Sequence, residues 1–129
     1  MSELTSGINW SAVVAGAVVA FLAGWLWYSP RLFGERWARA ANVSYDDSPP
    51  VAAMAMHFGG MVLLSWFVGI MAQAQMLATT VLLMIAGAIL GYATDGYLKI
   101  GTEDKLINAG YWIVAIVIMV AAQALVPAF

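Results

Sequence analysis

The sequence has no cysteine, a single histidine and few charged residues. The absence of cysteine excludes disulfides, thiolate metal sites and cysteine nucleophiles. One imidazole does not make a metal site, because zinc needs about three or four protein ligands. Charged residues make up 9% of the chain and the net charge is −2, without a basic run. We therefore expect no nucleic-acid partner.

Sequence motifs of known catalytic chemistry are also missing. The chain has no GxSxG, no P-loop, no HExxH and no pair of carboxylates at a spacing typical of acid–base catalysis. We therefore assign no catalytic, cofactor-binding or metal-binding residues, and we expect a protein that is not an enzyme. An enzyme acting on lipid or quinone is the least favoured of the function classes considered below.

The chain is instead rich in apolar residues, which make up 64% of it and give a mean hydropathy of +0.88. A soluble domain is about a quarter charged, so a water-soluble fold of this size could not hide so much apolar surface. A membrane helix needs about 20 apolar residues, and four such runs fill the length. The sequence predicts one all-α domain over residues 1–129, an integral membrane four-helix bundle. The predicted membrane helices cover about 8–28, 51–76, 79–98 and 105–126.

The basic residues predict how the helices are oriented. All five fall in loops on one side of the predicted bundle: Arg31, Arg36, Arg39, Lys99 and Lys105. Loops that carry Lys and Arg stay in the cytoplasm. We therefore expect a multi-pass protein of the inner membrane with both termini on the periplasmic side.

Residues 31–41 have the pattern of a short helix on the cytoplasmic surface. Arg31, Glu35 and Arg39 recur every four residues and share one face, with apolar residues on the other. Such a segment can simply anchor the first membrane helix, since interfacial Trp and Arg usually do so. It can also dock a partner or anionic lipid. The residues that would form this docking surface are Arg31, Phe33, Arg36, Trp37 and Arg39.

Small residues at four-residue spacing mark two helices for close packing. They are Gly16, Ala20 and Gly24 on the first predicted helix, and Gly87 and Gly91 on the third. Such residues let helix backbones approach closely in lipid. We expect the first and third helices to touch, and packing within one chain is favoured over a dimer face.

Polar residues inside the membrane are expensive and are therefore the default candidates for function. Each of the four helices places one in its cytoplasmic part, and with a neighbouring lysine they form a candidate cluster: Tyr28, His57, Asp95, Lys99 and Asn108. Asp95 and Lys99 have the spacing of a structural ion pair. The alternative is a titratable His57–Asp95 pair that carries a proton. His57 can also be a packing residue.

The two ends of the chain resemble a known family. The stretch INWSAVVAGAVVAFLAGWLWYSPRLFGERW is similar to the opening of the bacterial membrane-protein family catalogued as domain of unknown function 1761, and INAGYW at 107–112 is similar to its closing helix. The resemblance implies a four-helix bacterial inner-membrane protein and implies no activity. The matching residues are Asn9, Trp10, Trp27, Tyr28, Ser29, Pro30, Phe33, Gly34 and Trp37.

Two functions remain open. The first is a small non-enzymatic accessory or structural subunit that packs against a larger membrane complex, such as an energy-transducing one. The small body, the glycine faces and the minimal extramembrane surface favour it. The alternative is a small homodimeric transporter coupled to protons through His57 and Asp95. The expected partners are the lipid bilayer and either another membrane protein or a second copy of the chain.

Overall fold

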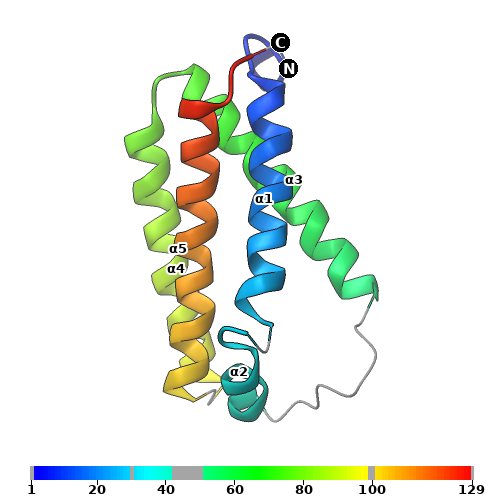
Figure 1. Ribbon diagram of the computed structural model, residues 1–129. Helices are drawn as coiled ribbons and strands as arrows, with labels where there is room; N and C mark the ends of the chain where they lie inside the picture. Colours follow the sequence, from blue (N-terminus) through cyan, green and yellow to red (C-terminus); the bar gives the residue numbers. More distant parts are fainter. Residues whose placement is uncertain (1, 30, 42–50, 99–100, 129) are drawn as a thin grey trace.

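The computed structural model describes residues 2–29, 31–41, 51–98 and 101–128, and this part of the chain is helical with no strand. Four of its helices are long and apolar enough to cross a membrane. The predicted all-α four-helix architecture is therefore confirmed. The elements are η1 (Ser2–Leu4), α1 (Trp10–Trp27), α2 (Gly34–Ala41), α3 (Val51–Gln73), α4 (Leu77–Tyr97) and α5 (Thr102–Leu125), shown in Figure 1.

The helices begin and end close to the predicted residues. The turn from α3 to α4 is tight, and Gln75 takes a positive φ of 61° there. The last helix begins at Thr102 rather than at residue 105, because Gly101 is already extended and serves as its N-cap. Glu103 and Asp104 thus lie in its first turn, where negative charge suits the helix dipole.

The interfacial helix was predicted over residues 31–41, and the helical part starts later, at Gly34. The backbone of Ser29 explains the difference, since its carbonyl accepts the N–H groups of Leu32 (3.1 Å) and Gly34 (2.9 Å). These bonds make residues 31–33 a turn, so Arg31 precedes the helix that carries Glu35 and Arg39.

The helix α5 is the centre of the bundle and contacts each of the other α-helices. Figure 1 shows both chain ends at one end of the molecule and α2 at the opposite end. It also shows α3 crossing behind α1 and leaning away from α4 and α5 towards its own beginning. Residues 51–60 of α3 are accordingly exposed, whereas Met61, Ser65, Val68 and Gly69 are buried.

Glycines on α1 allow close contacts with α3 and α5. An added Cβ at Gly16 would lie 2.7 Å from Ser65 Oγ, and one at Gly24 would lie 2.5 Å from the Tyr111 hydroxyl. Ser65 Oγ donates to the Val13 carbonyl at 2.7 Å, which joins α3 to α1. The predicted small-residue face of α1 is therefore a packing face, and Ala20 on it is fully buried.

The predicted contact between the first and third membrane helices is wrong. The helix α1 packs mainly on α5 and α3, while α4 packs mainly on α5. A Cβ at Gly87 or Gly91 would meet no atom within 4 Å. Small-residue spacing shows that a helix face could admit a neighbouring helix. In this fold α5 lies between α1 and α4, and no described helix packs against Gly87 and Gly91.

Side-chain hydrogen bonds fasten both ends of the α1–α5 pair. Asn9 caps α1 by accepting the Ala12 N–H at 3.2 Å, and its amide donates to the Val126 carbonyl at 2.7 Å. At the other end, Trp27 Nε1 donates to the Ile107 carbonyl at 2.9 Å. The two helices are thus held together along their full length.

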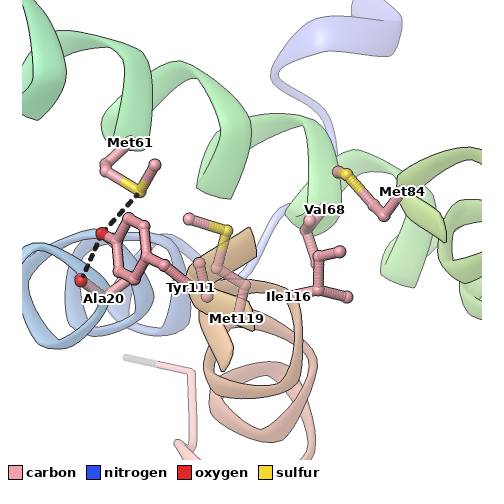
Figure 2. Packing of buried hydrophobic residues seen from close by; sticks show 8 residues of the cluster. Ala20, Met61, Val68, Met84, Tyr111, Ile116 and Met119 are labelled. Atoms are coloured by element: carbon pink, nitrogen blue, oxygen red, sulfur yellow. Dashed lines mark hydrogen bonds between the residues drawn. The ribbon is translucent and has the colours of Figure 1, made fainter. Parts of the chain in front are cut away.

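The buried core lies where α1, α3, α4 and α5 meet (Figure 2). Met119, Ala115 and Ala20 are completely buried, and Met84 from α4 lies near Val68 of α3 and Ile116 of α5. Methionine is flexible enough to fill irregular gaps between helices. This core occupies the middle and the chain-end half of the bundle and leaves the beginning of α3 outside it.

We expect Gly24→Ala to lower the free energy of unfolding in detergent by about 2 kcal/mol, because the new methyl group forces the Tyr111 ring out of its place. Gly87→Ala is the matched control and should be neutral or stabilising by up to about 1 kcal/mol, since alanine favours the helix. Denaturant titration followed by circular dichroism measures both. Equal effects of the two changes would contradict this packing.

Candidate functional site

A cavity of about 740 Å³ lies between α3, α4 and α5, on the side of the bundle that carries α2. Its polar lining comes from all four long helices or their ends: Tyr28, His57, Asp95, Asn108 and Tyr111. Four of the five residues predicted as a polar cluster thus line one cavity. The fifth, Lys99, lies outside the described residues, and so does its predicted ion pair with Asp95.

The first group of polar residues in the cavity is a hydrogen-bonded row. The Tyr28 hydroxyl donates to Asn108 Oδ1 at 2.7 Å, and Asn108 Nδ2 donates to Asp95 Oδ2 at 3.3 Å. The amide of Asn108 can do both because it carries an acceptor and a donor on one planar group. The row joins the ends of α1 and α4 through α5.

The second group is centred on Tyr111. Its hydroxyl donates to the Ala20 carbonyl at 2.8 Å, with Met61 Sδ 3.7 Å away (Figure 2). His57 Nε2 lies 3.1 Å from the same hydroxyl oxygen. A hydroxyl has one hydrogen, so with that hydrogen on Ala20 it accepts from His57, which places the imidazole proton on Nε2.

His57 and Asp95 are not bonded to each other in the structure. Each bonds instead to a different residue of α5, His57 to Tyr111 and Asp95 to Asn108. The Tyr28 and Tyr111 rings lie edge to face, with centroids 5.8 Å apart. The two polar groups are therefore neighbours across a tyrosine pair rather than one continuous chain.

Asp104 is not among the candidate residues predicted from the sequence, because a carboxylate in the first turn of a helix already suits the helix dipole. Asp104 is 2% exposed, and its Oδ1 has no hydrogen-bond partner among the described residues. The Trp37 indole is near enough to act on this carboxylate, yet its N–H falls outside hydrogen-bond geometry. Burial raises the pKa of the Tyr28 hydroxyl, and the negative charges of Asp104 and Asp95 raise it further.

A signal for the two residues that were missed, Asp104 and Tyr111, was present in the sequence, because both share a helix face with the predicted Asn108. Asp104, Asn108 and Tyr111 are spaced four and three residues apart, so they lie on one face of α5. Ala115 continues this face and is completely buried. The face of α5 that turns towards the bundle is therefore polar in its first turns and apolar afterwards.

The predicted docking surface divides into two parts. The Phe33 ring packs on Trp27 with centroids 4.6 Å apart, and the Trp37 ring packs on Tyr28 at 5.4 Å. These aromatic residues hold α2 against the bundle. Arg31, Arg36 and Arg39 are exposed, and Arg36 Nε approaches Glu103 Oε1 at 3.7 Å.

A smaller cavity of about 230 Å³ lies between α1 and the leaning part of α3. His57 lines this cavity as well as the larger one, and its ring packs edge-on against Phe21 with centroids 5.7 Å apart. The imidazole therefore stands between two spaces.

The fold and the cavity together define a helical membrane protein with a polar site in one half of its bundle. The chain matches the model of the family described as "Protein of unknown function (DUF1761)" over residues 11–123, and it belongs to that family. Comparisons with curated proteins and with solved structures found no match.

We expect Tyr111→Phe to lower the free energy of unfolding in detergent by about 1 kcal/mol, because the hydroxyl bonds to both α1 and α3. Tyr97→Phe is the control, since Tyr97 is 87% exposed and should be indifferent to losing its hydroxyl. Thermal unfolding of both purified variants measures the difference. Coinciding curves for the two variants would show that the Tyr111 bonds do not stabilise the bundle.

Proposed function

We propose that the protein binds a small amphipathic molecule in the cavity between α3, α4 and α5 and acts as a small transporter, without enzymatic activity. The observation that carries the proposal is the convergence of polar side chains from all four long helices on one cavity. Intramembrane polar groups are costly, and their gathering at one place supports a site rather than scattered packing residues.

The size and lining of the cavity suit a ligand. Its volume of about 740 Å³ lies within the range of about 300–1,000 Å³ that is typical of small-molecule sites. Apolar side chains such as Leu64 and Phe67 form much of the wall, with the polar groups at one end. Those groups bond to one another and to the backbone, an arrangement suited to orienting a ligand rather than to presenting a nucleophile.

Transport is supported by the position of the leaning half of α3. Residues 51–60 are exposed, and a movement of this half would break the contacts of His57 with Tyr111 and of Phe58 with Phe21 while leaving the buried half of α3 in place. His57 lies within it and faces both cavities, and Asp95 lines the larger one from α4. Coupling to protons through these two residues belongs to the proposal, as does a homodimer in which a second copy covers the cavity.

A second candidate function is the accessory subunit of a larger membrane complex. The observation that favours it is the same exposed half of α3, which offers a helix of another protein a surface along residues 51–60. The exposed arginines of the α2 region would then lie beside such a partner. Here the cavity would be closed by the partner rather than by a second copy.

The proposed location is the inner membrane of a bacterium, with both termini on the periplasmic side. The support is that Arg31, Arg36, Arg39 and Lys105 all lie at the α2 end of the bundle, opposite the termini. Basic residues remain on the cytoplasmic side of a membrane.

Mild-detergent extraction and native mass spectrometry test the binding proposal. We expect the protein to retain a low-mass amphipathic molecule, and Gly91→Trp to lose it because the indole would project into the cavity and take up space that the ligand needs. Gly91 lines the cavity, and a Cβ there meets no atom within 4 Å. Gly87→Trp is the control, one turn away and exposed. Spectra without a bound molecule, or unchanged by Gly91→Trp, would refute binding in this cavity.

The same extraction separates the two candidate functions. A transporter should elute as a monomer or homodimer that moves the retained molecule into liposomes, with accompanying proton movement. Co-elution of the chain with a larger complex, and no movement of the molecule in liposomes, would favour the accessory subunit.

A further inference from the structure

We infer that the ligand of the cavity is a hydrophobic organic cation, such as a quaternary ammonium or phosphonium compound with aromatic or alkyl groups. The inference rests on the proposed function, since it requires that the cavity binds a small molecule. It adds the charge and the shape of that molecule, which come from the side chains around the cavity.

The charges near the cavity favour a cation. Asp95 lines the cavity from α4, and Asp104, which is not part of the lining, is buried on α5 one turn before the lining residue Asn108. Among the described residues, Asp95 is the charged side chain that lines the cavity, so the formal charge of the lining itself is negative. Lys105 Nζ lies over the Tyr92 ring, and Arg36 approaches Glu103.

Within the described part of the chain, few hydrogen bonds reach these two carboxylates. Asp95 accepts a bond from the Asn108 amide at 3.3 Å, and Asp104 Oδ1 has no partner in the described part of the chain. A carboxylate inside a membrane protein is costly unless an opposite charge is near. A cationic ligand offsets this cost, whereas an anionic ligand adds to it.

The aromatic walls supply the second argument. Phe67, Tyr92, Tyr111 and Trp112 line the cavity with Tyr28. Lys105 Nζ already lies over the Tyr92 ring, 4.7 Å from its centroid, so a ring of this cavity receives a cation in the structure itself. Aromatic faces attract cations through their quadrupole and accept the apolar groups around a quaternary centre.

The surroundings of the cavity explain why the cation should be hydrophobic. Its space is bounded by helices that face lipid, and Leu63 and Leu64 on α3 line it together with Ala88 on α4. A strongly hydrated cation would lose its water there without replacement. A cation whose charge is covered by aromatic or alkyl groups loses little water and gains apolar burial.

Two probes of the same shape and opposite charge test the inference, tetraphenylphosphonium and tetraphenylborate. Equilibrium dialysis of the full-length protein in detergent measures their binding, and Gly91→Trp defines the part that depends on the cavity. We expect this part to be saturable and at least tenfold tighter for the phosphonium. Asp95→Asn should weaken phosphonium binding at least tenfold, and Glu103→Gln, which changes an exposed acid, should leave it unchanged.

The outcomes separate the inference from the proposed function. Cavity-dependent binding of the borate as tight as that of the phosphonium, or phosphonium binding unaffected by Asp95→Asn, would overturn the cationic ligand and leave the cavity a binding site. If neither probe shows binding that Gly91→Trp removes and the native protein retains no molecule, both the inference and the proposed function are wrong.

Discussion

The rest of the structure depends on the close approach of α1 to α5 at Gly24. Because Gly24 has no side chain, the Tyr111 hydroxyl can reach the Ala20 carbonyl at 2.8 Å. Lipid supplies no hydrophobic drive between helices, so tight packing and such bonds must hold them together. The oxygen of the same hydroxyl lies 3.1 Å from Nε2 of His57 on α3. One side chain thus connects three helices and forms the inner wall of the cavity.

The cavity follows from how α3 is held. Its second half is fixed by Ser65, which bonds to α1, and by Val68, which is completely buried in the core. Its first half is exposed, is held by His57 at the Tyr111 hydroxyl and by Phe58 on Phe21, and leans away from α4 and α5 (Figure 1). The space that results is bounded by polar residues because the first turns of α5 are polar there. Packing in one half of the bundle therefore allows a site in the other half.

Much of the fold could be predicted from the sequence because hydropathy and helix length are set by the membrane itself. The depth of each polar residue follows from its position along a helix, so the gathering of Tyr28, His57, Asp95 and Asn108 at one level was predictable. The direction in which a side chain points around the axis was harder to predict. That is why Gly87 and Gly91 were assigned a neighbour that the structure does not provide.

The residues that were missed share a cause. Asp104 suits a helix N-terminus whatever it faces, so its charge gave no reason to expect burial, and its 2% exposure depends on α2 and on the end of α1. Tyr111 is one of the 16 Phe, Tyr and Trp residues of the chain and stands in an apolar helix. Its importance arises from Gly24, 87 residues earlier in the chain, and no local pattern joins the two. The periodicity of a sequence indicates which residues share a helix face, but it does not indicate which distant segments of the chain come into contact.

The bond between Asn9 and Val126 joins groups that are 117 residues apart and has a consequence for how the protein is made. Of the four long helices, α1 is synthesised first and its principal neighbour α5 is synthesised after the other three. Before α5 is made, α1 can contact α3, but Gly24 still lacks its contact with Tyr111 of α5. Assembly of the bundle is therefore a late event, completed only when the final helix enters the membrane and its end meets the beginning of the first.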